Sequence, residues 1–466
     1  AEYMGEQELA EEQMVRAVIG DQVQLDLAEE QISRSGVTPQ VGLVIGKLSH
    51  KLDRGFIYSL ISTPQNDAGD PACSLVGTSI GEDHKKKGAK SKSVSCSLTS
   101  LAIDCDWVAE HARQVARMMV GGVKVIGIYV WAGELVFKNS AAGFCQTLMS
   151  VSKAASLTNT RVDESLLLHI SNSPRRWTCR NFISSSSTSS SNLRPCEFKT
   201  GKVLNYLQIF KSDYNFELRL PITHESSNTL GEILREAIFC HEEDLKEANV
   251  LVDGNFVLNE ESLTADEQPR SVEFISPFMK SALLEGFEEV KEKDVSGTVI
   301  LSGAVAAFSC SNTKEPLSEA VADVKSDIIT TLRSRVDTMC EAKDGEEQAI
   351  GKAMGNEKWR LPFPRRVLIR WVGCVLICDY LLPNETPEAV VDHCKELFSM
   401  EMTNVIEAEA EAEASGKTSS DAADVSKIAV SGSNSSQNVF LGNFAVFSAL
   451  IFLLSLIIGF VIFSRR

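Results

Sequence analysis

The stretch DWVAEHARQVARMMVGGVKVIGIYVW, residues 106–131, predicts the centre of the fold. Its first half repeats apolar residues at the spacing of an amphipathic helix over Asp106–Met119. The apolar positions on this helical face are Val108, Ala112, Val115 and Met119. Gly121-Gly122 ends the helix, and the β-branched and aromatic run Val123–Trp131 is typical of a strand. The stretch therefore predicts a helix that packs on a β-sheet.

On the N-terminal side, the sequence predicts a helix over Asp21–Ser35 and a β-hairpin made by Val41–Leu48 and Gly55–Thr63. A polar insertion over residues 64–95 follows, with a basic cluster from His84 to Lys92. This cluster fits a nuclear-localisation or anionic-lipid patch, but a solvated loop tip is the favoured interpretation in a membrane-anchored chain.

On the C-terminal side, the remaining elements fall into two groups. The first group has a helix over 140–155, strands over 165–170, 177–182, 203–210 and 216–222, a helix from residue 226 and short strands within 250–258, interrupted by a Ser-rich loop over 184–192. The second group has a strand over 298–309, a helix over 316–339, strands over 367–371 and 375–381, and a helix over 386–400. The expected class is therefore α/β (α+β).

These groups suggest a domain plan. An acidic leader occupies residues 1–13, a first α/β domain 14–260 with the insertions at 64–95 and 184–192, and a second α/β module 271–400. A Glu/Ala- and Ser-rich tether then covers 401–438, and an apolar segment covers 444–463. Whether the two modules share one core is left open by the sequence.

The segment Phe444–Phe463 carries no charge and, at about 1.5 Å per residue, is long enough to cross a hydrocarbon core of roughly 30 Å. We expect it to be a transmembrane tail anchor, with the bulk of the chain in the cytosol. The anchor residues are Phe444, Leu450, Leu454, Ile458 and Phe463. An endoplasmic-reticulum membrane is expected, and a mitochondrial outer-membrane anchor is the alternative.

Composition and motifs narrow the classes of function that the chain can have. A net charge of -17 argues against nucleic-acid binding, and 12 cysteines without a C-x-x-C pair indicate reduced thiols. No phosphate loop, nucleophile elbow or dinucleotide fingerprint is present, so no cofactor is expected.

The β-β-α-β unit around the opening stretch is similar to the MPN fold. Active enzymes of that class need two histidines at H-x-H as zinc ligands, but Val130, Trp131 and Ala132 stand at this place, and none of the seven histidines lies two residues from another. Cysteine chemistry has two candidate neighbours, Cys240 beside His241 and Cys394 beside His393, whose adjacent side chains point apart on a helix. We predict no enzyme activity. The rival reading is a membrane-anchored metal- or cysteine-dependent hydrolase whose site is assembled from distant residues.

Two blocks resemble the odr-four-like family, named from an odorant-response-abnormal gene. They are residues 103–131 and RVLIRWVGCVLICDYLLPNETPEAVVDHCKELF, residues 366–398. The resemblance implies an endoplasmic-reticulum membrane protein that assists folding, localisation or trafficking of multi-pass membrane receptors. It also implies a scaffold that tethers a ubiquitin-fold-modifier cysteine protease through a catalytically silent MPN-like domain.

Several side chains within these blocks are candidates for partner binding, although burial in the core would explain each as well. They are Trp107, His111, Arg113, Tyr129, Trp131, Arg366, Asp379 and Tyr380.

Overall fold

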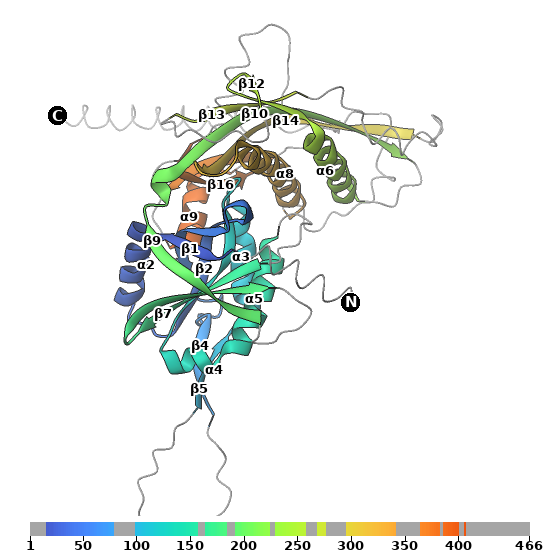
Figure 1. Ribbon diagram of the computed structural model, residues 1–466. Coiled ribbons are helices and arrows are strands. Elements are labelled where there is room, and N and C mark those ends of the chain that lie inside the picture. Colours follow the sequence, from blue (N-terminus) through green and yellow to red (C-terminus); the bar gives the residue numbers. More distant parts are fainter. Residues whose placement is uncertain are drawn as a thin grey trace, which may run out of the picture.

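A closed barrel of strands forms the N-terminal part of the computed structural model (Figure 1). The structure describes residues 15–78, 98–156, 164–183, 192–223, 229–257, 268–275, 295–341, 364–382, 385–399 and 405–406. The barrel strands, in spatial order, are β1 (Ala17–Asp21), β3 (Arg54–Ser62), β2 (Gln40–Ser49), β6 (Lys124–Trp131), β7 (Glu164–Asn172), β8 (Arg175–Ile183) and β9 (Leu193–Gly201). The β2–β3 hairpin, which turns through η1 (His50–Leu52), confirms the sequence prediction.

Helices cover the barrel on two sides. α3 (Cys105–Arg117) and α5 (Ala141–Ala155) pack against each other and contact β6, and the short α4 (Glu134–Asn139) precedes α5. The predicted apolar face of α3 is buried, and the side chain of Asp104 caps its N-terminus by accepting a hydrogen bond from the Trp107 amide. α2 (Gln22–Arg34) buries Leu25 and Ile32 in a separate core. The expectation that residues 106–131 form a helix on a sheet is thus confirmed.

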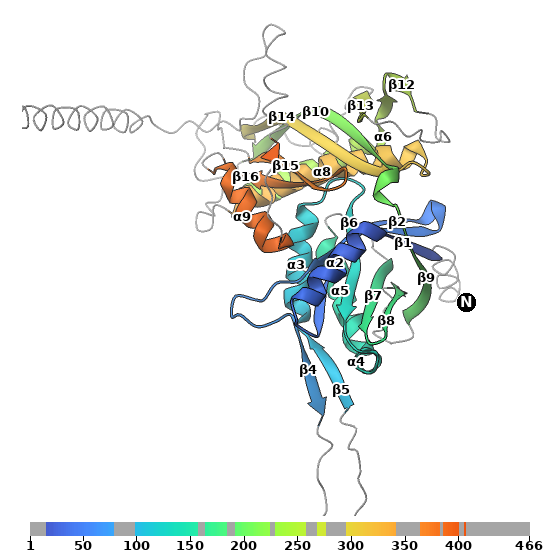
Figure 2. The same cartoon turned by 90° about the vertical axis from the view of Figure 1, so that its left-hand side faces the viewer.

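A two-stranded arm made by β4 (Cys73–Thr78) and β5 (Leu98–Ile103) projects from the barrel (Figure 2). The insertion predicted at 64–95 therefore contributes a strand. The strand leaves the core after its first residue, since Cys73 is buried whereas Leu75 and Val76 are exposed. The basic cluster lies outside the described residues.

A second sheet lies above the barrel, in the order β12 (Asn255–Phe256), β11 (Asn249–Val252), β13 (Arg270–Ile275), β10 (Leu207–Thr223) and β14 (Val295–Asn312). It packs on α6 (Leu230–Glu247) and α8 (Leu317–Glu341). β10 pairs with β14 from Leu207↔Asn312 to Thr223↔Val295, so the two strands predicted at 203–210 and 216–222 are one.

This long pairing moves the domain boundary. The sequence places residues 207–257 in the first domain, but β10, α6, β11 and β12 belong to the sheet or the apolar core of β14 and α8. The sheets therefore divide the chain near residues 202–206 rather than between 260 and 271.

A third, small sheet has the order β16 (Val375–Leu381), β15 (Arg365–Val372) and β17 (Val405–Ile406), and α9 (Pro387–Phe398) packs on it. Its buried residues belong to the same apolar cluster as those of α3 and the barrel. The C-terminal elements thus share a core with the N-terminal barrel, which answers the question that the sequence left open.

The localisation predicted from the sequence, a single pass through the endoplasmic-reticulum membrane, is not supported by the structure and is corrected here. Within the described ranges, no helix combines the length and the apolar character that crossing a bilayer requires. Phe444–Phe463, on which that prediction rested, lies outside the described residues, as does the tether predicted over 401–438 apart from β17.

Candidate functional site

The segment that follows α3 joins the layers of the molecule. Met119 bridges to Ile377 of β16, and Gly121 bridges to Ser309 of β14. The Gly121 amide donates to the Phe308 carbonyl at 3.0 Å, and the Cys378 amide donates to the Met118 carbonyl at 2.8 Å. One short segment thus connects β14 to β16 by backbone hydrogen bonds, and we call residues 118–122 the junction segment.

Two glycines allow the backbone of the junction segment to lie close to α8 and β14. A Cβ atom on Gly121 would lie 2.4 Å from the Asp323 carbonyl oxygen, and one on Gly122 would lie 2.5 Å from the Cys310 carbonyl oxygen. Gly122 also has a φ of +78°, which a residue with a side chain adopts only with strain. The sequence signalled these glycines only as the end of a helix, whereas they also hold α8 and β14 against the barrel.

A buried ion pair lies directly behind the junction segment. Arg366 of β15 donates to both carboxylate oxygens of Asp327 on α8, at 2.7 and 2.9 Å, and both side chains are 1% exposed. Asp327 also accepts from the Gly121 amide at 2.9 Å and from the Phe308 amide at 2.8 Å. This carboxylate therefore binds groups from β15, β14 and the junction segment at once.

A second buried cluster ties the barrel to α8. Lys47 of β2 donates to Glu315 at 3.0 Å and to Asp323 of α8 at 2.5 Å. Burial by itself would lower the pKa of Lys47, but the two carboxylates raise it well above its ordinary value. Lys47 is thus a permanent cation inside the molecule.

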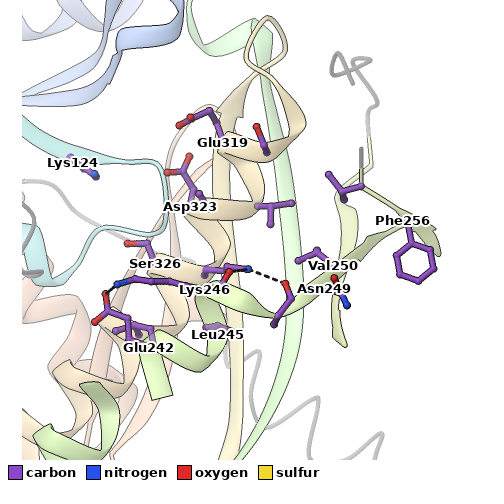
Figure 3. A pocket seen from close by; sticks show the side chains of 17 residues that line it. Lys124, Glu242, Leu245, Lys246, Asn249, Val250, Phe256, Glu319, Asp323 and Ser326 are labelled. Atoms are coloured by element: carbon purple, nitrogen blue, oxygen red, sulfur yellow. Dashed lines mark hydrogen bonds and ion pairs between the residues drawn. The ribbon is translucent and has the colours of Figure 1, made fainter. Parts of the chain in front are cut away.

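An open cleft borders this cluster (Figure 3). It has a volume of about 690 Å³, and its walls come from the end of α6, the first half of α8, β11, β12 and Lys124 at the start of β6. Asp323, which binds Lys47, also lines the cleft. Barrel and second sheet therefore both contribute to it.

The cleft combines paired charges with an apolar wall. Lys325 donates to the carbonyls of Lys246 and Ala248, at 2.9 and 3.1 Å, where it caps the end of α6. Lys246 pairs with Glu242 at 3.3 Å. The apolar lining residues include Leu245, Val250, Phe256, Val257, Val321 and Ile329. Sequence reasoning missed this surface because its residues are far apart along the chain.

Comparison with known proteins assigns the chain to a family. A model of the family described as odorant response abnormal 4-like matches residues 42–407, which include most of the barrel, the junction segment and both further sheets. The chain belongs to the odorant response abnormal 4-like family.

Relatives named "Protein odr-4 homolog" occur in distant organisms. That of Xenopus tropicalis is 24% identical over 322 residues, which cover 64% of this chain and 70% of the relative. That of Homo sapiens is 24% identical over 316 residues, and that of Dictyostelium discoideum is 23% identical over 374 residues, covering 77% of this chain and 74% of the relative. Among solved structures, the UfSP from C. elegans aligns with a TM-score of 0.40 at 9% identity, over 82% of this chain and 56% of that chain, which is too weak to assign a fold.

In this odorant response abnormal 4-like chain, most of the predicted partner-binding residues are in the core. His111, Tyr129, Trp131, Arg366 and Tyr380 are buried. The His111 ring contacts the Leu397 carbonyl at 2.9 Å, and the Tyr129 hydroxyl shares a hydrogen bond of 2.7 Å with Ser62. These residues hold elements of the chain together, and partner binding by them stays a prediction.

The other predicted residues are nearer to the surface. The indole of Trp107 donates to the Pro64 carbonyl at 2.9 Å, and Arg113 pairs with Glu110 on the same helix. Asp379 accepts from His393 at 2.9 Å. The structure does not bring them into one site, since Trp107 lies at the start of α3 and Asp379 on β16.

The thiol and imidazole neighbours do not form nucleophile–base pairs. His241 bonds to the Tyr214 hydroxyl at 2.9 Å, and burial lowers its pKa to about 4. His393 bonds to Asp379, and burial raises the pKa of Cys394 to about 12. Within the described residues, no group of three or more His, Cys, Asp and Glu side chains could hold a metal ion. The absence of enzyme activity stays a prediction.

Proposed function

We propose that this chain is a non-catalytic adaptor that assists the folding, localisation or trafficking of membrane receptors and holds a ubiquitin-fold-modifier protease. The observation that carries the proposal is the family match over residues 42–407, because it spans the barrel and the sheets around the cleft and the family is named for an abnormal odorant response. The barrel serves as an MPN-like domain that lacks the H-x-H zinc motif after β6.

The cleft between α6, α8 and β12 is the proposed contact for a partner. It is open and partly apolar, and some of its charged side chains are already engaged within the chain, since Lys246 pairs with Glu242 and Lys325 donates to the carbonyls at the end of α6. Phe256 at its rim is 66% exposed and is available as an anchor.

The receptor role is tested by surface display. Cells that lack the chain express a multi-pass receptor with an extracellular epitope, and flow cytometry measures the receptor after rescue with wild type or Phe256→Asp. Phe239→Asp is the matched control, since Phe239 is 45% exposed on α6 but does not line the cleft. We expect rescue by wild type and by the control and a loss with Phe256→Asp. Failure of the wild type would reject the receptor role, whereas equal rescue by all three would reject the cleft.

The protease contact is tested with purified proteins. Isothermal titration of the full chain with a ubiquitin-fold-modifier protease should give saturable binding that Phe256→Asp weakens and Phe239→Asp retains. Cleavage of a ubiquitin-fold-modifier precursor by the chain alone would favour the rival hydrolase.

A further inference from the structure

Two free cysteines face each other across neighbouring barrel strands. Cys179 of β8 is the direct antiparallel partner of Cys196 of β9. Opposed residues of antiparallel strands have Cα atoms about 4.5–5.5 Å apart, and disulfides join Cα atoms about 4.4–6.8 Å apart. The backbone spacing of the two cysteines therefore fits a disulfide without movement of either strand.

The surroundings hold both sulfurs in place. Cys179 is buried in the core beneath α2. The Cys196 sulfur lies 3.5 Å from the Arg16 carbonyl oxygen and 3.7 Å from that of Val15, beside β1. Trp177 and Phe198, on the same two strands, stack at 5.9 Å between ring centroids. The pair thus lies where β9 meets β1 and the barrel closes.

A lowered pKa in a partly buried position distinguishes Cys196 from the other described thiols whose pKa is shifted. Because Cys196 is only partly buried, we expect small oxidants to reach its sulfur. A hydrogen bond donated by the Cys179 thiol lowers the pKa of Cys196. Burial raises the pKa of thiols elsewhere, including Cys240, Cys374 and Cys394. A partly exposed thiol whose direct cross-strand neighbour is a second thiol is the arrangement of an attacking and a resolving cysteine.

We propose that Cys196 and Cys179 form an oxidative modification site that hydrogen peroxide converts into a cross-strand disulfide. The Cys196 thiolate attacks the peroxide, a sulfur–oxygen bond forms, the oxygen–oxygen bond breaks and hydroxide leaves to become water. The Cys179 sulfur then attacks the Cys196 sulfenic acid, the disulfide forms, and water leaves with the Cys179 proton. Two thiols and one peroxide yield one disulfide and two waters.

The disulfide would join β8 covalently to β9, next to the strand pairing between β9 and β1. A bond between these strands closes the loop of residues 180–195 and restricts the unfolded chain. The oxidised protein should therefore unfold at a higher temperature than the reduced one, and dithiothreitol should reverse the shift.

The test uses the full chain treated with hydrogen peroxide. Peptide mapping without reduction should find the Cys179–Cys196 linkage as the first product, with free-thiol labelling lost at both residues together. Cys179→Ala should leave Cys196 as a sulfenic acid that dimedone labels. Cys240→Ser, at a partly exposed thiol on α6, is the control and should leave the linkage unchanged.

Two outcomes would overturn the proposal. One is oxidation of Cys196 to sulfinic acid in the wild type with Cys179 still free. The other is oxidation of a different cysteine first. In Cys179→Ala, dimedone labelling confined to Cys196 would indicate a reactive thiol in a folded protein. In a variant that has failed to fold, labelling of the buried cysteines would rise as well.

Discussion

The contact of the barrel strands with α3 and α5 and the junction beneath the second sheet are both closed to solvent, but by different chemistry. Aliphatic residues of the barrel strands, such as Leu43, Ile45 and Ile128, pack in the same apolar cluster as α3 and α5. At the junction, Arg366 and Asp327 meet as charges, and Lys47 meets two carboxylates. Apolar contacts tolerate small changes in orientation, whereas a bidentate ion pair is satisfied in one orientation only. We infer that the charges fix how the second sheet sits on the barrel.

The largest effect is expected from Asp327→Ala. This change leaves the Arg366 guanidinium buried without its carboxylate and removes an acceptor from the Phe308 amide and from the Gly121 amide, of which Gly121 keeps the Phe308 carbonyl. Removal of one partner of a buried pair costs about 3–5 kcal/mol of unfolding free energy. Urea unfolding followed by circular dichroism measures the loss.

The control for this prediction is the double variant Asp327→Leu with Arg366→Met. Because it removes both charges, it should recover much of the stability lost in Asp327→Ala. A double variant as unstable as the single one would show that the charge itself is not what the junction depends on.

Leu43→Ala provides the contrasting change within the barrel. Loss of a fully buried Leu side chain costs about 2–5 kcal/mol through lost transfer free energy and the remaining cavity. The reactivity of Cys378 then shows which of the two changes opens the junction, because the buried sulfur of Cys378 lies 3.3 Å from Arg366. In native buffer, a thiol reagent should modify Cys378 faster in Asp327→Ala than in Leu43→Ala. Equal rates would mean that the junction opens only when the whole molecule unfolds.

Gly122→Ala should destabilise the junction without changing any charge. Its Cβ would meet the Cys310 carbonyl, and its backbone would stay in the left-handed region. Strain of this kind costs about 1–3 kcal/mol. Gly143→Ala is the matched control, because that glycine lies in α5 with open space around it, and alanine there should be neutral or stabilising by about 0.5–1 kcal/mol. The comparison is read from the midpoints of urea unfolding.

The sequence predicted those parts of the fold that are determined locally. The helix α3, the strand β6 and the β2–β3 hairpin follow from apolar periodicity within a short window. β9 was missed because its sequence, LRPCEFKTG, is polar and includes Pro195, and because its partners β8 and β1 are set by barrel closure. Periodicity also could not show that the residues after 206 leave the barrel.

The junction was harder to predict because its members are far apart in the chain. The available signal was a charged residue inside an apolar strand, such as Lys47 in VGLVIGKLS or Arg366 before VLI. For Arg366 the sequence leaves partner binding and burial in the core open, because its partner Asp327 lies on α8 and no local pattern pairs them. A lone charge in a buried strand indicates an ion pair, and only the tertiary fold identifies the partner.

The smallest expected effect concerns the partly exposed pair of Asp379 and His393, which joins β16 to α9 outside the buried junction. The hydrogen bond to Asp379 raises the pKa of His393 above its ordinary value of 6.5. Because the folded pKa is the higher one, this stabilisation is fully present below the unfolded pKa and is lost as the pH rises through the folded pKa.

Since His393 is 45% exposed at its side chain, solvent screening limits the contribution to about 1 kcal/mol or less. His393→Gln should therefore be less stable than wild type near pH 5.5 and nearly equal to it near pH 8.5, as measured by urea unfolding at the two pH values. Asp379→Asn should abolish the same pH dependence. A difference between wild type and His393→Gln that stays constant with pH would mean that the histidine acts by packing alone, and that charge stabilises this chain only where the ion pairs are buried.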